Sequence, residues 1–425
     1  MRGQLLVIFL LLSLGLAPAH TQLRGHGGPV RALSISPDGQ TAVSGSFDSS
    51  AIRWSLQTDT AEQVLRFHDS AVNAVSMSSD GRMATGGADA RIAIWRPGEQ
   101  HPQMVFQGHI APVVALAFSP DGTTLASASW DRTARLWSLL GGSGRVLEGH
   151  EQNVNAVAFM PDGRSLVTAG YDATLRIWPL VLSSLPIISI LPTPLSAAAV
   201  TPDGEIITAG ADGNVYFLSA AGELRENVRA GESPVIALAV SPDGTMVAAA
   251  GVHGSVAIIE RARRKLLRTL VGPGIPVWSV SFFPDNHTLL TGGADSALRR
   301  WDAATGDPIE MVTGRRDDPL SAFAGDPGAE VFRACVACHA LKPAERNRAG
   351  PTLAGLFGRR IATLPGYNFS PALKKLDIVW TPETVSKLFE LGPAVYTPGT
   401  KMPEQKITSA ADRLALVTFL ERATK

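Results

Sequence analysis

Cysteine is almost absent from this sequence, because only Cys335 and Cys338 occur in a chain of 425 residues. No cysteine remains for disulfides, and a zinc site at this pair would lack the two further soft ligands that it needs. Net charge is absent as well, since 38 Lys and Arg balance 38 Asp and Glu. No basic cluster stands out, so the composition gives no support for nucleic-acid binding.

Long apolar runs are missing except near the start of the chain. The run from Leu5 to Leu16 follows the positive Met1-Arg2 and precedes Ala17-Pro18-Ala19, a small-residue cleavage pattern. This order predicts a cleaved secretory signal peptide at residues 1–19, with an uncleaved anchor as the alternative. No other stretch approaches about 20 apolar residues, so we expect a soluble mature protein that is not an integral membrane protein.

The two cysteines lie in one pentapeptide, Cys335-Val336-Ala337-Cys338-His339. The C-x-x-C-H pattern is typical of c-type haem attachment, although C-x-x-C alone also occurs in redox dithiols. Here the thiols would bond the porphyrin vinyl groups and His339 would be the proximal iron ligand. Downstream there is no other histidine and a single methionine, Met402, in a loop rich in Pro and Gly. The sequence therefore predicts one covalent haem c with His339 and Met402 as metal ligands, unless Met402 is only a buried loop residue.

Further motifs follow each other between residues 326 and 425. They are Gly328-x-x-x-Phe332, Gly350-Pro351-x-Leu353-x-Gly355-Leu356-Phe357-Gly358-Arg359, Gly366-Tyr367, Trp380, Pro398-Gly399-Thr400-Lys401-Met402 and the terminal helix Leu414 to Leu420. This set resembles a class I cytochrome c of the mitochondrial and related bacterial type.

The resemblance implies a small all-α cytochrome c domain in which the first helix crosses the last. It also implies that the Pro351 carbonyl accepts the second ring N–H of His339, which fixes the tautomer. By the same resemblance, Arg359 and Trp380 hold a haem propionate and Thr400 fixes the methionine loop. The chain departs from the family where Phe369, and Phe389 or its neighbour Leu388, replace tyrosines. The loss of those hydroxyls is expected to alter the reduction potential.

The chain ahead of residue 314 is a repeat. Asp-Gly turns begin at residues 38, 80, 121, 162, 203 and 243, with Asp285-Asn286 as a seventh, so the spacings are 42, 41, 41, 41, 40 and 42 residues. An Asp-Gly pair between alternating apolar residues is typical of a hairpin. A period near 41 with Gly-His at one end and Trp at the other resembles the four-stranded WD40 blade. We therefore expect an all-β seven-bladed WD40 propeller at residues 22–313.

Four blades share a set of polar residues that looks like a catalytic triad. The sets are His26, Ser44, Asp48 and Trp54; His68, Thr85, Asp89 and Trp95; His109, Ser127, Asp131 and Trp137; and His150, Thr168, Asp172 and Trp178. A constellation repeated in four blades indicates a structural hydrogen-bond network, so we predict no catalytic residues here. Blades five and six lack the set, and we expect packing alone to hold them.

The residue before each network aspartate is aromatic in blades one, three and four, namely Phe47, Trp130 and Tyr171. In WD40 proteins this position tends to point onto the top face. The three rings are therefore either an anchor cluster for a partner or packing over the channel rim.

Two further points concern the ends of the repeat. The outer strand of the last blade is supplied either by Gln22-Leu23-Arg24 or by Pro308 to Val312, and the sequence leaves both open. Residues 314–325 form a short polar linker, which places the cytochrome domain at 326–425 near blade seven or blade one.

Charge is divided between the two parts. Residues 326–425 carry 14 Lys and Arg against 9 Asp and Glu, a formal +5, and the remainder carries 24 against 29, or −5. A basic cytochrome face would steer encounters with acidic redox partners.

Two classes of function follow. The first is an electron-transfer protein of the bacterial periplasm, where haem attachment takes place. Its propeller and haem edge would dock a periplasmic or membrane redox protein. The second is a haem peroxidase or a gas or redox sensor in which Met402 is displaced from the iron. A catalytic propeller is disfavoured, because the blades offer no metal-spaced histidine cluster and no unexplained acid–base pair.

Overall fold

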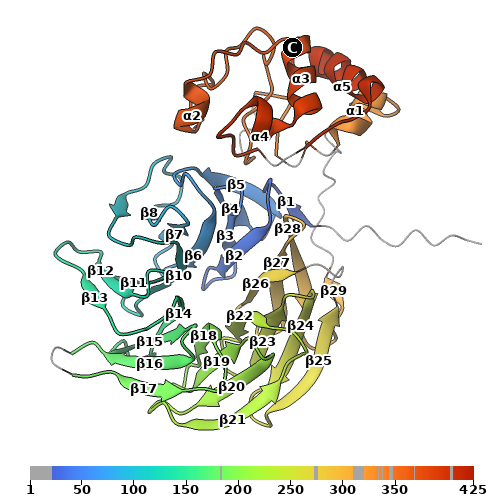
Figure 1. Cartoon of the computed structure of the whole chain (residues 1–425). Helices are drawn as coiled ribbons and strands as arrows, with labels where there is room; N and C mark the ends of the chain where they lie inside the picture. The colour runs from blue at the N-terminus through green and yellow to red at the C-terminus, as the bar shows by residue number, and fades with distance from the viewer. Residues whose placement is uncertain are drawn as a thin grey trace, which may run out of the picture.

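The computed structural model describes residues 22–181, 184–271, 276–309, 320–333, 335–336, 338–343, 348–367, 369–402 and 405–425. The predicted signal peptide at 1–19 and the first half of the predicted linker, 314–319, lie outside these residues. The described residues form a ring of antiparallel sheets and a smaller helical unit that lies against one side of it (Figure 1).

The ring contains seven sheets, each of four strands in chain order except the last. Blade one has β2 (Val30–Ile35), β3 (Thr41–Ser46), β4 (Ala51–Ser55) and β5 (Thr60–Leu65). Blade two has β6 (Val72–Met77), β7 (Met83–Gly87), β8 (Ile92–Trp95) and β9 (Met104–Phe106). Blade three has β10 (Val113–Phe118), β11 (Thr124–Ser129), β12 (Ala134–Ser138) and β13 (Arg145–Leu147). Blade four has β14 (Val154–Phe159), β15 (Ser165–Gly170), β16 (Thr174–Pro179) and β17 (Ile187–Ile190).

The remaining blades complete the circle. Blade five has β18 (Leu195–Val200), β19 (Ile206–Gly210), β20 (Asn214–Leu218) and β21 (Leu224–Arg229). Blade six has β22 (Val235–Val240), β23 (Met246–Gly251), β24 (Ser255–Glu260) and β25 (Lys265–Val271). Blade seven has β26 (Val277–Phe282), β27 (Thr288–Gly293) and β28 (Ala297–Asp302), with β1 (Leu23–Arg24) and β29 (Pro308–Ile309) beside β28. The seven-bladed propeller predicted from the repeat is confirmed.

The Asp-Gly turns join the first and second strands of the blades as the spacing predicts. In blade three, Gly122 has a φ of 68°, a left-handed conformation that costs glycine little. The carboxylate of Asp121 accepts the backbone N–H of Thr123 at 3.0 Å, which closes the turn.

Ring closure uses parts of both segments that the sequence offered, while residues 310–312 of the second segment lie outside the described residues. Leu23 pairs with Leu298, and Ile309 pairs with Arg300 further along β28. Since β27 occupies the other edge of β28, the outer strand of blade seven is made of two short pieces from opposite ends of the repeat region. Leu23 is 1% exposed and packs in the core between blades seven and one.

The predicted polar network is present in all four blades that carry the set. In blade one, the ring Nδ1 of His26 lies 3.0 Å from Asp48 and its Nε2 lies 2.8 Å from the Ser44 hydroxyl, which accepts the indole N–H of Trp54 at 2.7 Å. Corresponding bonds join the residues of blades two, three and four. These bonds give each histidine, hydroxyl and indole N–H of the four sets a partner, so the network is structural.

The expectation that packing alone holds blade five is wrong. Asp212 accepts the phenolic O–H of Tyr216 at 2.5 Å and the amide N–H of the Asn214 side chain at 2.7 Å. Burial and then the bond to Asp212 raise the pKa of Tyr216 to about 12. Blade five therefore replaces the histidine network with a shorter one on a single hairpin.

The helical unit begins with the 3-10 turn η1 (Ser321–Phe323). Its helices are α1 (Pro327–Phe332), α2 (Pro371–Lys374), α3 (Pro382–Leu391), α4 (Pro393–Tyr396) and α5 (Ala410–Ala423). The helices α1 and α5 cross closely, because a Cβ on Gly328 would lie 2.1 Å from the Ala415 carbonyl oxygen. The rings of Phe332 and Phe419 meet beside this crossing at 5.4 Å, inside one apolar core with the buried face of α3.

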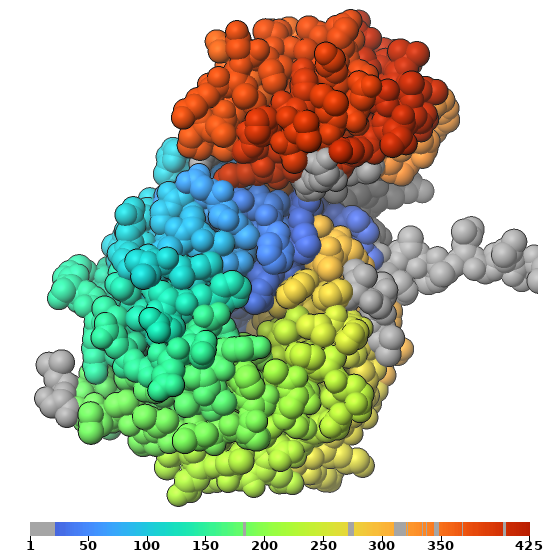
Figure 2. Space-filling model, in the orientation of Figure 1, coloured from blue at the N-terminus to red at the C-terminus, as the bar shows by residue number. Residues whose placement is uncertain are grey.

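The helical unit rests on the first part of the propeller, coloured blue in Figure 2. The N–H of Ala349 donates to the Gly25 carbonyl at 3.3 Å, and the guanidinium of Arg66 lies 4.7 Å from the ring centre of Tyr367. These propeller residues belong to blade one and to the segment that enters blade two. No helix of the described residues is both long and apolar enough to cross a membrane.

Candidate haem site

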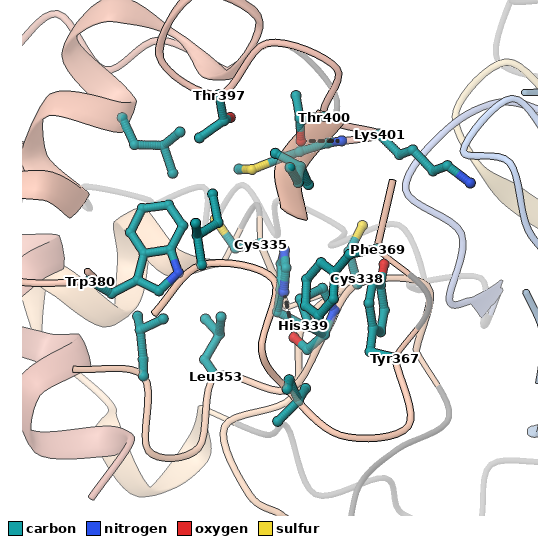
Figure 3. Close-up of a pocket in the computed structure, with 18 of the residues that line it drawn as sticks. Cys335, Cys338, His339, Leu353, Tyr367, Phe369, Trp380, Thr397, Thr400 and Lys401 are labelled. Atoms are coloured by element: carbon teal, nitrogen blue, oxygen red, sulfur yellow. Dashed lines mark hydrogen bonds between the residues drawn. The ribbon is translucent and has the colours of Figure 1, made fainter. Parts of the chain in front are cut away.

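The C-x-x-C-H run continues directly from α1. The N–H of Cys335 donates to the Phe332 carbonyl at 2.7 Å, and the N–H of His339 donates to the Cys335 carbonyl at 2.9 Å. These successive turns bring both thiols and the imidazole to one cavity (Figure 3). Burial raises the pKa of Cys335 to about 11, and burial followed by the nearby Asp48 charge raises that of Cys338 to about 12.

The imidazole of His339 is held by its own backbone neighbourhood. Its Nδ1 lies 2.8 Å from the Pro351 carbonyl oxygen, which can only accept, so Nδ1 carries the proton and Nε2 is left as the electron-pair donor. Burial lowers the pKa of the ring, which favours the neutral form that binds metals. Gly350 lies against the ring, because a Cβ there would lie 2.6 Å from His339 Cε1.

Met402 is carried by a tight loop on another wall of the cavity. The N–H of Met402 donates to the Thr400 hydroxyl at 3.1 Å, and the Ser370 hydroxyl donates to the Gly399 carbonyl at 2.7 Å. Gly399 has a φ of 81° and packs against Ala372, where a Cβ would lie 2.4 Å away. The loop thus depends on a glycine at this position and on a hydroxyl at position 400.

All eight haem-site residues predicted from the sequence line this one cavity. They are Cys335, Cys338, His339, Pro351, Arg359, Trp380, Thr400 and Met402. Most of the other lining residues are apolar, and they include Leu353, Leu356, Phe369, Leu388 and Phe389. Two thiols, an imidazole nitrogen and a thioether around an apolar cavity are the groups that a covalently bound haem needs, so these residues fit it.

Two residues that line the cavity make contacts that the sequence did not predict. The Arg359 guanidinium donates to the backbone carbonyls of Ala354 at 3.0 Å and Thr352 at 3.1 Å, so part of its donor capacity braces the chain. Phe369, which replaces a family tyrosine, packs on the ring of Tyr367 at 4.6 Å. The Tyr367 hydroxyl donates to the Ala349 carbonyl at 2.8 Å, and Tyr367 itself lines the cavity.

The propeller also contributes to the cavity, which the sequence reasoning missed. Gly27 and Asp48 of blade one lie in its wall beside Cys338 and Lys401. The Lys401 ammonium reaches the His68 carbonyl of the propeller, and its side chain extends toward the propeller ribbon in Figure 3. No sequence signal marks this, because residues some 300 positions apart meet here and Asp48 already has a role in the blade network.

The three aromatic residues proposed as a partner anchor are exposed. Phe47 is 46% exposed, Trp130 45% and Tyr171 54%. Their neighbours differ, since Phe47 meets Trp278 edge-on and the Trp130 indole N–H donates to Asn155 at 3.2 Å. No group of three or more metal-ligating His, Cys, Asp or Glu occurs among the described residues.

The fold and the cavity define the class of this protein: a WD40-type propeller joined to a unit built to bind a c-type haem. The family model for the WD domain, G-beta repeat, matches residues 17–55, 60–96, 100–138, 141–179 and 264–302. A segment of 99 residues is 42% identical to cytochrome c of Cochliobolus lunatus, and the match covers 23% of this chain and 91% of that protein. The corresponding match to cytochrome c of Arabidopsis thaliana is 42% over 99 residues, which is 23% of this chain and 88% of the relative.

A bacterial relative is similar over the same length. Cytochrome c2 of Blastochloris viridis is 38% identical over 96 residues, which cover 21% of this chain and 75% of that protein. Through this segment of about 100 residues, the chain belongs to the cytochrome c family.

Proposed function

We propose that this chain is a periplasmic c-type cytochrome that transfers single electrons through one covalently bound haem ligated by His339 and Met402. The observation that carries the proposal is the convergence of all eight sequence-predicted haem residues on one apolar cavity. The helical unit would then be a class I cytochrome c domain of all-α type. Similarity to cytochromes c along most of their length supports this assignment.

Each part of the site has a separate task. The bound haem would supply the one-electron Fe(II)/Fe(III) couple. Cys335 and Cys338 would anchor it, and the Pro351 carbonyl would hold the His339 ring with Nε2 toward the cavity. Thr400 would keep Met402 in place, so that no open iron position is left for substrate.

The propeller has a different task in this proposal. Its exposed Phe47, Trp130 and Tyr171 would dock a periplasmic or membrane redox protein, because aromatic anchors dominate interface energetics. The N-terminal signal pattern supports export to the periplasm.

The test is the optical spectrum of the purified holoprotein, oxidised and reduced, with and without carbon monoxide. Electron transfer predicts a weak band near ~695 nm in the oxidised form, the mark of an iron–methionine bond in this family, and little carbon monoxide binding. Met402→Ala should lose that band and bind carbon monoxide, whereas Met246→Ala in blade six should change neither. Ready ligand binding by the unaltered protein would replace the proposal with a peroxidase or sensor.

A further inference from the structure

The wall of the haem cavity nearest the propeller contains a carboxylate. Asp48 lines it and accepts the Gly27 N–H, and its charge acts on Cys338, Tyr367 and Lys401, which line the same cavity. Contacts on either side hold this wall in place. Arg66 stacks on Tyr367 and donates to the Arg348 and Ala349 carbonyls, and Lys401 donates to the His68 carbonyl.

The Asp48 carboxylate is buried and fully hydrogen-bonded. Its side chain is 4% exposed, and it accepts from His26 Nδ1 at 3.0 Å and from the Gly27 N–H at 2.7 Å. The N–H of Ser50 at 2.9 Å and its hydroxyl at 2.7 Å bind the other oxygen. Burial alone would raise the pKa of Asp48, but the hydrogen bonds from His26, Gly27 and Ser50 outweigh it and hold that pKa below its usual range. Asp48 is therefore an anion at neutral pH.

A fixed anion beside a redox centre favours the more positive oxidation state. The ferric haem carries one more positive charge than the ferrous haem, and a low-dielectric wall weakens the interaction much less than water does. Lys401, Arg359 and Arg360 also line the cavity with positive charge. Lys401 and Arg359 are shared with carbonyls of the protein, and Arg360 pairs with Asp377 at 3.3 Å. Asp48 is the acidic side chain among the described residues that line the cavity.

We propose that Asp48, a propeller residue, is part of the haem site and lowers the reduction potential of the cytochrome domain. This inference rests on the proposed function, because it assigns a residue to the same haem. It gives blade one a second role beside its structural network. The fusion of the two domains would then set the potential at which the protein works.

The experiment is a spectroelectrochemical titration of the full-length holoprotein and of Asp48→Asn. The amide keeps an acceptor for His26 and removes the charge. Asp131→Asn is a matched control. The Asp131 side chain is 2% exposed and accepts hydrogen bonds from His109, Ile110 and Thr133, as Asp48 does from its own partners. Asp131 does not line the cavity. Asp48→Ser and Asp131→Ser form a second pair in case an amide disturbs the blade. Loss of one carboxylate is compatible with folding, since blade six has His253 at this position.

We expect the Asp48 variants to shift the midpoint potential upward on the order of tenfold in the redox equilibrium constant, about 59 mV for one electron. The Asp131 variants should match the unaltered protein. Unchanged potentials in either folded Asp48 variant would overturn the inference. Failure of the proposed function is distinguishable, because it would show in the unaltered protein as a missing covalent haem or a missing reversible couple.

Discussion

Gly350 leaves the room that the His339 ring needs. A Cβ there would lie 2.6 Å from His339 Cε1 and 2.8 Å from the Cys338 carbonyl oxygen. Neither group can retreat freely. The ring is tied to the Pro351 carbonyl, and the Cys338 carbonyl accepts the Gly350 N–H at 2.8 Å.

Gly350→Ala should therefore lower both haem content and stability. Overpacking of this kind typically costs about 1–3 kcal/mol, and here the displaced atoms belong to His339, the proposed iron ligand. Haem absorbance per protein and thermal unfolding measure the two effects. Gly231→Ala is the control, because a Cβ at Gly231 meets nothing within 4 Å. Equal haem content in the two variants would contradict the argument.

Four of the haem-site residues were predictable from residue type and spacing, whereas Pro351, Arg359, Trp380 and Thr400 followed only from the resemblance to cytochrome c. Cys335, Cys338 and His339 are adjacent in the chain, and Met402 is the sole methionine after them. Asp48 was not predictable as a haem neighbour, since only the docking of the two folded parts brings it to the cavity.

At the scale of the blade, one hydroxyl serves two buried partners. In blade four the Thr168 hydroxyl lies 2.7 Å from His150 Nε2 and 2.9 Å from Trp178 Nε1. All three groups are buried, so water cannot replace the hydroxyl.

Thr168→Val should leave both ring nitrogens unpaired. Each buried unsatisfied group costs about 1–3 kcal/mol, and two groups lose their partner here. We therefore expect the free energy of unfolding to fall by an amount near the upper end of that range or above it. Chemical denaturation of the full chain would measure the change. Thr208→Val in blade five is the control, because its buried hydroxyl donates to the Ala197 carbonyl at 2.8 Å and serves no ring. If Thr168→Val and Thr208→Val lower the free energy of unfolding by similar amounts, the network adds no more stability than an ordinary buried hydrogen bond.

The same networks predict acid sensitivity. Burial lowers the pKa of His150, so the folded propeller resists its protonation and loses stability as pH falls below the ordinary value of about 6.5. Although burial alone would raise the pKa of Asp131, bonds from His109 and Thr133 hold it below its usual range. The stabilising contribution of Asp131 is complete above about pH 3.9 and is lost as the pH falls below that value.

Melting temperature measured at constant ionic strength should therefore fall below about pH 6.5 and again below about pH 4. His150→Gln should reduce the first decline, because the group that resists protonation is gone. A melting temperature unchanged between pH 7 and pH 4 would contradict this account.

Sequence patterns predicted the repeated blades well, but they did not predict the hydrogen bonds of blade five or how the ring closes. The period and the Asp-Gly turns are local signals, so the predicted turn at Asp121-Gly122 does join the first two strands of blade three. The hydrogen bond from Tyr216 to Asp212 in blade five was not predicted, because it depends on strand geometry that the repeat pattern does not contain. Ring closure was left open because the sequence offered two segments as alternatives. In the structure Leu23–Arg24 and Pro308–Ile309, one piece from each segment, share the edge of one strand.

At the scale of the whole molecule, Arg66 makes several contacts between the propeller and the helical unit. Its guanidinium lies over Tyr367 and donates to the carbonyls of Arg348 and Ala349. The Tyr367 hydroxyl meets the same Ala349 carbonyl, and the Ala349 N–H reaches Gly25. One side chain thus braces the segment that leads into Gly350 and the proximal ligand.

Arg66→Ala should loosen this contact without unfolding either part. Hydrogen–deuterium exchange should rise at the Ala349 amide and around Lys401, whose ammonium binds the His68 carbonyl nearby. Arg82→Ala is a matched control, because Arg82 also lies over a ring, that of Phe118 at 5.8 Å, and donates to a carbonyl, that of Gly122 at 2.7 Å. That pair lies wholly within the propeller, so its loss should leave exchange in the haem unit unchanged. If exchange at residues 348–350 is the same in both variants, Arg66 does not hold the propeller against the haem cavity. The position of Asp48 in the cavity wall would then need another support.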